Sequence, residues 1–392
     1  MRNILALVFL LQCHVEVCFA KTFKATTKIS VVAMPDPIEG PAPLAEVDMP
    51  TWRKGQVINE WRQIQGSALA LVPIAVKTYP GLGATGPESK VTAWNSFVID
   101  TRNSFVYSPA NGGHNDYAGN EVDRIQLEDG APSWTEIRAS TPLAQIVAGS
   151  HYLDGRPSSR HTFYGALFNE QRNRIIVAKG AKYDPSGGEH QAVDGFNVLT
   201  NDWDTKRTYP DQPGEAFVAA SAYVSNKSTG DIYTFNNFGV FKWTNLTNTW
   251  SKRRDGSIYG QYAASAHDSK RNRILVLGGE NNDRGIYDIA QNTIQQIALG
   301  GTSAGAVGGT GSGMVYVDGL DAFVYTKGAS GGAVYRIDPQ TFSVTVLATT
   351  GGGQMPATVA NGVWGRFLYA PRLKGIIYCP TYTGNMWFLR TH

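Results

Sequence analysis

The stretch that decides the fold is residues 261–298, which contains YAASAHD (262–268), SKRNRILVLGG (269–279), RGIYDIA (284–290) and NTIQQIA (292–298). Each segment is a short run with the apolar content of a β-strand, and Gly, Asn and Asp residues typical of turns separate the segments. The stretch therefore predicts four short strands, the second of which ends in a Gly-Gly pair.

The same unit recurs along the chain. Copies span residues 161–208 and 216–253, and others begin near Val91, Gly311 and Gly362. Four-stranded repeats of this length are typical of β-propeller blades, which stack around an axis because one blade cannot bury both of its faces. A polar turn, often Arg-Asn-Arg, leads into the second strand. We predict second strands that begin near Phe105, Ile175, Ile232, Ile274, Phe323 and Ile376.

The last copy is one strand short. Residues 362–370, 375–379 and 385–389 give three strands before the chain ends at His392, and residues 59–64 have the form of a fourth strand with no blade before it. Pairing the early strand with the last blade would remove two exposed sheet edges. We therefore expect an all-β domain over residues 57–392, a single propeller of six four-stranded blades closed in this way. The stretch 66–90 and the long spacing between the first two copies leave room for a seventh blade as the alternative count.

The N-terminus has the pattern of a secretory signal peptide. Arg2 supplies a positive end, residues 4–11 are apolar, and Ala20 is a small residue before a polar stretch. We expect cleavage near Ala20, a secreted or periplasmic protein, and a linker or wrapping arm over residues 21–56. Cleavage removes two of the three cysteines and leaves Cys379 as a buried thiol that has no intrachain partner.

The composition excludes several classes of protein. Aromatic residues make up 11% and charged residues 17% of the 392 residues, which is too aromatic and too weakly charged for a disordered chain. A net charge of +3 supplies no strong field for nucleic acid or an anionic membrane. The N-terminal apolar run is too short to span a membrane. We expect a monomer that binds neither nucleic acid nor membrane.

Three features of the repeat resemble kelch repeats: the Gly278-Gly279 pair after the second strand, Tyr287 in the third strand and Trp203 in a fourth strand. Residues 57–392 resemble the central domain of galactose-oxidase-type propellers and, more distantly, propeller-type polysaccharide lyases such as ulvan lyases. The first resemblance implies a copper radical oxidase with Tyr and His ligands and a Tyr–Cys crosslink, yet Cys379 stands in an apolar strand. The second implies a secreted lyase whose face is rich in His, Tyr and Arg.

Blade topology places the chemistry-bearing loops on one face, because strands alternate in direction. Loops between second and third strands then share a face with the connections between blades. Residues 111–120 and 181–191 are loops of the first kind, and residues 154–164 lead into a first strand near the mouth of the central channel. We expect His114, Arg160, His161 and His190 to converge there.

An elimination reaction on a uronic-acid polysaccharide suits this face. It needs a cation for the carboxylate, a base for the neighbouring proton and an acid for the leaving oxygen. We assign Arg160 to the carboxylate and either His114 or His161 to the base. Either Tyr183 or Tyr117 would be the acid. Aromatic and amide side chains suit sugar rings. The expected substrate-binding residues are Asn115, Asp116, Lys182, His190, Asn236, Tyr262, Trp364 and Arg366.

Three other functions stay open. A non-catalytic kelch-type propeller would bind a glycan or a protein on the same face, a hydrolase would pair Asp116 with Glu189, and a copper oxidase would follow the galactose oxidase resemblance. No cofactor is predicted, although a structural calcium or zinc ion stays open. His267 ends a first strand, which places it on the opposite face, and we interpret it as structural.

Overall fold

A computed structural model describes residues 42–72, 83–184, 188–190, 192–214, 220–256 and 261–392. All of them belong to the second of two compact units, residues 37–392. The predicted signal peptide and its cleavage site lie outside these ranges. Within them, no helix has the length and apolar character needed to cross a membrane.

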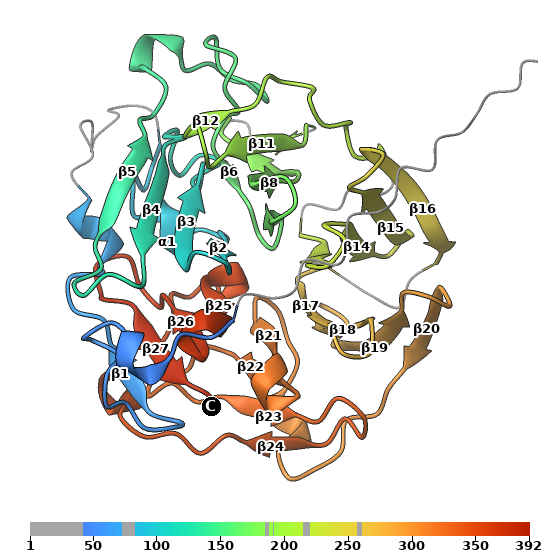
Figure 1. Ribbon diagram of the computed structural model, residues 1–392. Coiled ribbons are helices and arrows are strands. Elements are labelled where there is room, and N and C mark those ends of the chain that lie inside the picture. Colours follow the sequence, from blue (N-terminus) through green and yellow to red (C-terminus); the bar gives the residue numbers. More distant parts are fainter. Residues whose placement is uncertain (1–41, 73–82, 185–187, 191, 215–219, 257–260) are drawn as a thin grey trace, which may run out of the picture. The chain divides into compact units, whose positions relative to one another are not determined.

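The described residues form six four-stranded antiparallel sheets and one three-stranded sheet, which confirms the all-β prediction (Figure 1). The first three four-stranded sheets contain β2 (Val98–Asp100), β3 (Phe105–Pro109), β4 (Val122–Gln126) and β5 (Trp134–Arg138); β7 (Ala166–Asn169), β8 (Arg174–Val177), β11 (Asp194–Asn197) and β12 (Asp202–Trp203); and β13 (Ala222–Ser225), β14 (Ile232–Asn236), β15 (Gly239–Thr244) and β16 (Thr249–Asp255).

The other three sheets follow the same plan. They contain β17 (Ala263–Asp268), β18 (Arg273–Gly278), β19 (Asp283–Asp288) and β20 (Thr293–Gln296); β21 (Gly313–Val317), β22 (Ala322–Thr326), β23 (Tyr335–Ile337) and β24 (Val344–Val346); and β25 (Phe367–Ala370), β26 (Gly375–Tyr378), β27 (Trp387–Arg390) and β1 (Trp61–Gln63). One short α-helix, α1 (Ser89–Thr92), precedes β2. All six predicted second strands begin within one residue of the expected position.

The first strands of the six sheets contact one another in chain order. β2 contacts β7, and the contacts continue through β13, β17, β21 and β25, which contacts β2 again. Apolar side chains fill the space between neighbouring sheets. For example, Tyr107 of β3 stacks on Phe168 of β7 with ring centroids 6.2 Å apart. Each sheet therefore buries its faces against the sheets before and after it.

The two ends of the described chain share one sheet, as the sequence predicts. β1 pairs with β27 in antiparallel register, with Trp61 opposite Leu389 and Gln63 opposite Trp387. The described part of the predicted linker or arm also lies against this sheet. Trp52 packs edge-on against Phe388 at 5.2 Å, and the buried Arg53 donates from Nε to the carbonyl of Leu373 at 3.3 Å.

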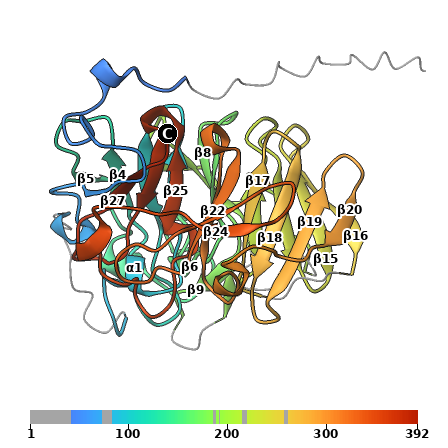
Figure 2. The same cartoon turned by 90° about the horizontal axis from the view of Figure 1, so that it is seen from below.

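The three-stranded sheet positions the candidate site. It contains β6 (Arg160–His161), β9 (Gly180–Lys182) and β10 (Glu189–His190). β6 immediately precedes β7 and β9 immediately follows β8, so this sheet continues two strands of the second four-stranded sheet. In Figure 2, α1, β6 and β9 lie at one end of the strands and the C-terminus lies at the other.

Candidate functional site

His114 and His161 meet at the end of the strands marked by β6 and β9. The centroids of their rings lie 5.8 Å apart, although one ring comes from the β3–β4 connection and the other from β6. The backbone N–H of His114 donates to the carbonyl of Ala181 at 3.3 Å, and its carbonyl accepts from the N–H of Asp184 at 3.0 Å. The three loops that the sequence placed together therefore touch here.

Gly113 permits this close approach. Its φ is +76°, and a Cβ at this position would lie 2.2 Å from the backbone nitrogen of His161. Only glycine accepts both the left-handed conformation and this contact. The glycine therefore lets the loop press against β6 and brings His114 to the neighbouring imidazole.

His161 and Asp116 form a carboxylate–imidazole dyad. Nε2 of His161 lies 2.8 Å from Oδ2 of Asp116, and the hydroxyl of Thr85 donates to the other carboxylate oxygen at 2.8 Å. The hydrogen bond from His161 lowers the pKa of Asp116 below its usual value, so the carboxylate is ionised and only accepts. Nε2 of His161 therefore carries the proton.

The remaining nitrogen of His161 is suited to accept a proton. Burial lowers the pKa of His161 below its ordinary value, which keeps the ring neutral at neutral pH. With the proton on Nε2, Nδ1 carries the lone pair of the neutral ring. The orientation of a base by a carboxylate is a recurring arrangement in general acid–base catalysis.

Four aromatic side chains extend the site across the starts of the first strands, and we call them the aromatic rim: Trp94, Phe163, Tyr262 and Trp364. The ring of Trp94 lies 5.1 Å from that of His161, and His161 in turn lies 6.1 Å from Phe163. Phe163 lies 6.0 Å from Tyr262 and 5.4 Å from Trp364. Trp94 and Tyr262 are partly exposed. The rim thus offers aromatic surface next to the dyad.

The rim is built on strained backbone. Phe163, Tyr262 and Trp364 have φ values of +47°, +67° and +52°. Bulky residues rarely adopt this left-handed conformation, which costs on the order of 1–3 kcal/mol per residue, and such strain gathers at functional sites. Three aromatic residues with strained backbone that contact one another therefore mark this surface as a candidate functional site.

Backbone hydrogen bonds show that the rim residues occupy equivalent positions at the starts of the first strands of the first, second, fourth and sixth sheets. The N–H of Phe163 donates to the carbonyl of Trp94 at 2.7 Å, the N–H of Tyr262 donates to Ala220 at 2.9 Å, and the N–H of Trp364 donates to Gly311 at 3.2 Å. Each bond joins the start of one first strand to the start of the strand before it. The rim residues therefore lie at the same end of the first strands β2, β7, β17 and β25.

The expected role of Arg160 as a carboxylate clamp is wrong. Arg160 is fully buried, and its guanidinium donates to Asp194 at 2.5 Å and to the carbonyls of Ala178 and Ala192 at 3.3 and 3.4 Å. A substrate carboxylate would have to displace Asp194 from a buried ion pair, which is costly. Arg160 is a structural residue.

His190 is likewise buried and does not reach a ligand, so its expected substrate contact is also wrong. Its Nδ1 lies 3.1 Å from the carbonyl of Ala192 and its Nε2 lies 2.5 Å from that of Ser150. Burial and the nearby Arg160 charge hold its pKa well below the usual range. The adjacent His151, which the sequence analysis did not single out, bonds Asp194 at 2.9 Å.

The two candidate acids differ in their surroundings. Tyr117 is buried and donates its hydroxyl to Glu121 at 2.9 Å, so the expected acid role does not suit it. Tyr183 is also buried, but its backbone runs next to that of His114: its own N–H donates to Ser159 at 2.8 Å and the N–H of Asp184 donates to His114. Burial raises the pKa of Tyr183, which therefore keeps its proton.

The remaining predicted binding residues separate into reachable and buried groups. Asn115 is exposed, Tyr262 is partly exposed, and Lys182 is partly buried with Nζ 3.5 Å from Asp184. Three other expected contact residues are buried and already hydrogen-bonded within the protein, so Trp94 and Tyr262 are the rim residues that a ligand can reach. Asn236 accepts from the N–H of Phe238, Trp364 donates from Nε1 to the carbonyl of Asn361, and Arg366 donates to the carbonyls of Cys379 and Gly362.

Cys379 offers no accessible thiol to this face. Its thiol is free and fully buried after β26, and burial raises its pKa to about 11. Across the described ranges, no group of three or more His, Cys, Asp and Glu side chains is arranged to hold a metal ion. The dyad, His114 and the rim are therefore the chemistry that this face offers.

The sequence analysis missed Thr85, Trp94 and Asp194. An ionisable side chain in an apolar strand, as Asp194 is in β11, signals a buried partner and was the available clue. Comparison with known proteins adds no further residue, because no protein-family model matches the chain and no curated protein matches it in sequence.

Proposed function

We propose that residues 57–392 form a single six-bladed β-propeller of kelch-like blades, related in architecture to galactose-oxidase-type central domains. The contacts that pass from β2 through the other first strands and back to β2 support closure. The β1–β27 pairing supplies the fourth strand of the last blade. The three-stranded sheet continues the second blade, which argues for six blades rather than seven.

We further propose that the protein is a secreted polysaccharide lyase that cleaves a uronic-acid-containing polysaccharide by β-elimination. The observation that carries this proposal is the dyad: a His161 ring that bonds Asp116 and lies beside His114 and Trp94 of the aromatic rim. Aromatic faces pack against the apolar faces of sugar rings. The exposed imidazole of His114 can donate a hydrogen bond to a uronate carboxylate.

In this proposal His161 takes the proton from the carbon next to the uronate carboxylate. The electron pair of that carbon–hydrogen bond forms the new carbon–carbon double bond, and the bond to the glycosidic oxygen breaks. The His114 imidazole donates a hydrogen bond to the carboxylate in place of Arg160, and Tyr183 gives its proton to the leaving oxygen. Asp116 stabilises the imidazolium that forms on His161.

A non-catalytic glycan-binding propeller is the second candidate, and a specific observation favours it. Asp194 holds the guanidinium of Arg160 in the interior of the protein. The face therefore lacks the positive charge that β-elimination needs to neutralise the uronate carboxylate. The aromatic rim alone would suffice for sugar binding.

The test is ultraviolet absorbance with a panel of uronic-acid polysaccharides, because the unsaturated product ends absorb and the intact chains do not. The lyase proposal predicts a rise with the wild-type protein and a loss of at least about a hundredfold in rate for His161→Gln. His267→Gln, remote from the dyad, is the matched control and should retain the activity. Glycan binding with no absorbance rise on any polymer would favour the binding module and overturn the lyase proposal.

A further inference from the structure

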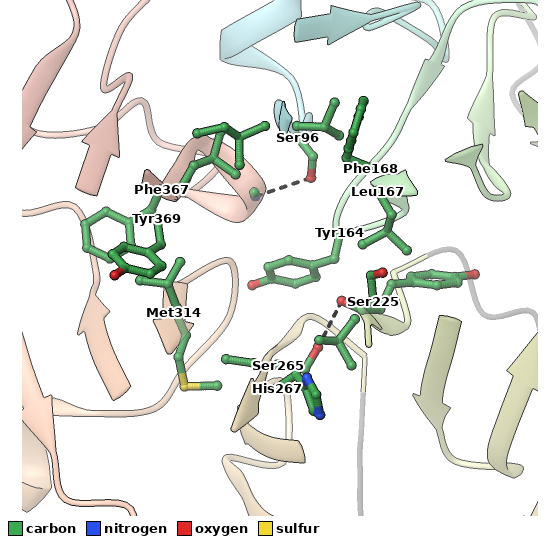
Figure 3. Close-up of a pocket in the computed structure, with 18 of the residues that line it drawn as sticks. Ser96, Tyr164, Leu167, Phe168, Ser225, Ser265, His267, Met314, Phe367 and Tyr369 are labelled. Atoms are coloured by element: carbon green, nitrogen blue, oxygen red, sulfur yellow. Dashed lines mark hydrogen bonds between the residues drawn. The ribbon is translucent and has the colours of Figure 1, made fainter. Parts of the chain in front are cut away.

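A second candidate site lies between the six first strands, toward the end opposite the dyad. It is a cavity of about 210 Å³ with lining residues from every first strand (Figure 3). Tyr262 precedes β17 and belongs to the aromatic rim, whereas His267 is near the other end of the same strand. Five residues of extended chain span about 17 Å. The His267 end of the cavity is therefore well separated from the dyad.

One side of the cavity is aliphatic. Ile99, Leu167, Val315 and Leu368 come from β2, β7, β21 and β25, line the cavity and are partly exposed. Aliphatic surface that faces a hollow gains free energy when an apolar molecule displaces water from it. This wall therefore favours an apolar body.

The other side carries hydrogen-bonding groups from β13 and β17. Ser225, Ser265 and His267 line it, and the hydroxyl of Ser265 already donates to the carbonyl of Tyr223 at 3.0 Å. Figure 3 shows His267 without a hydrogen bond, and neither of its buried ring nitrogens has a partner among the described residues. Asn272 lies close enough to raise the pKa of His267 but not in hydrogen-bonding geometry. Buried polar atoms without partners are rare and costly.

The charges around His267 favour an uncharged ligand. Burial lowers the pKa of His267, so its ring is neutral at neutral pH, with one nitrogen as donor and one as acceptor. Glu170, Asp318 and Lys227 line the cavity where the first strands end, which gives two carboxylates and one ammonium group. This balance disfavours an anion. A hydroxyl group, in contrast, both donates and accepts and so pairs with either nitrogen.

We propose that this cavity binds a small uncharged molecule with one aromatic ring and one hydroxyl group, the hydroxyl on His267 and the ring against the aliphatic wall. The size is suitable, because an apolar cavity of about 150 Å³ in another protein holds benzene and this one measures about 210 Å³. The proposal does not rest on the lyase function: the cavity shares no residue with the dyad, and Trp364 is the rim residue that also lines it.

The experiment is isothermal titration of the full chain with 4-methylphenol, and with toluene as the same ring and methyl group without the hydroxyl. We expect 4-methylphenol to bind about five- to tenfold more tightly, the ratio that one hydrogen bond supplies. His267→Phe should reduce the affinity for 4-methylphenol to that for toluene. Leu167→Trp, which fills the cavity from the aliphatic wall, should abolish the binding of both.

Three results would overturn the proposal: no heat with either probe because water alone fills the cavity, equal affinity for the two probes, or unchanged 4-methylphenol binding in His267→Phe. Circular dichroism establishes that each variant is folded. His161→Gln should bind 4-methylphenol as the wild type does, so a failure of the lyase proposal leaves this test intact.

Discussion

Arg160 and His161 are neighbours in the chain and have opposite environments. Successive side chains of a strand point to opposite faces, so β6 directs the two side chains to different neighbours. The guanidinium meets Asp194 and two carbonyls, while the imidazole, also buried, meets Asp116, His114 and Trp94. One two-residue strand therefore separates a structural ion pair from the candidate reactive centre.

Arg160→Met should destabilise the fold by about 3–5 kcal/mol, because it leaves the Asp194 carboxylate buried without its cation. Urea unfolding measures the change. Arg138→Met is the matched control, since its ion pair with Asp202 is solvent-exposed and should cost at most about 1 kcal/mol. Equal losses in the two variants would contradict the structural role given to Arg160.

Asp116→Asn should lower kcat by about 10²–10⁴-fold, because the dyad then no longer orients or stabilises the His161 imidazolium. It should also move the acid limb of the pH profile. The wild-type limb should lie below pH 6.5, since burial lowers the pKa of His161. The Asp116 charge raises that pKa, so its removal should move the limb to still lower pH. A limb that moves upward or stays in place would show that another group titrates.

At the scale of elements, turn chemistry made the strands predictable. Asn173 and Asn272 form the Arg-Asn-Arg turns with φ values of +52° and +49°, and Asn tolerates the left-handed region better than other residues with a Cβ. Each of these turns marks the residue at which the following second strand, β8 or β18, begins. For this reason the second strands were located to within one residue from sequence.

The site was less predictable than the strands. The sequence placed the right loops together, as the contact between His114 and His161 shows. It did not reveal that Arg160 and Asp194, 34 positions apart, would form a buried pair, because pairing across strands depends on packing and on strand facing. The left-handed backbone conformation of aromatic residues such as Tyr262 could not be predicted from the sequence either, because aromatic residues intrinsically prefer other conformations.

Asn201 tests the turn argument. It has a φ of +54° in the turn between β11 and β12, and its side-chain oxygen has no hydrogen-bond partner within the described part of the chain. Asn201→Gly should leave the free energy of unfolding unchanged or raise it by a few tenths of a kcal/mol, whereas Asn201→Val should lower it by about 1–2 kcal/mol. Thermal unfolding distinguishes the two variants, and equal stability would show that the turn is not strained by a Cβ.

At the scale of the whole molecule, the pairing of β1 with β27 joins segments more than 300 residues apart. Trp61 of β1 is buried, and its Nε1 donates to the carbonyl of Gly332 at 2.9 Å in the neighbouring sheet's β22–β23 connection. Gly332 and Gly352 leave room for the indole, since a Cβ on either would lie within 3.0 Å of it. Strand β1 therefore connects the sheet that contains β25, β26 and β27 to the neighbouring sheet of β21, β22, β23 and β24.

Trp61→Ala should therefore lower the free energy of unfolding by about 3–5 kcal/mol, the usual effect of emptying a buried aromatic site. Chemical unfolding followed by both tryptophan fluorescence and circular dichroism gives the value. Ile58→Ala, at a side chain that is 55% exposed just before β1, should change stability by less than about 0.5 kcal/mol. A similarly small effect of Trp61→Ala would argue against a closing role for β1.

The most direct test of the central claim is nitrogen NMR of the His161 imidazole across a pH titration, with Asp116→Asn as the reference. The claim is that burial keeps His161 neutral, and that Asp116 fixes the proton on Nε2 so that Nδ1 can act as a base. The expected spectrum shows that tautomer at neutral pH and a pKa below 6.5. A proton on Nδ1, or an imidazolium that persists above pH 7, would contradict the account.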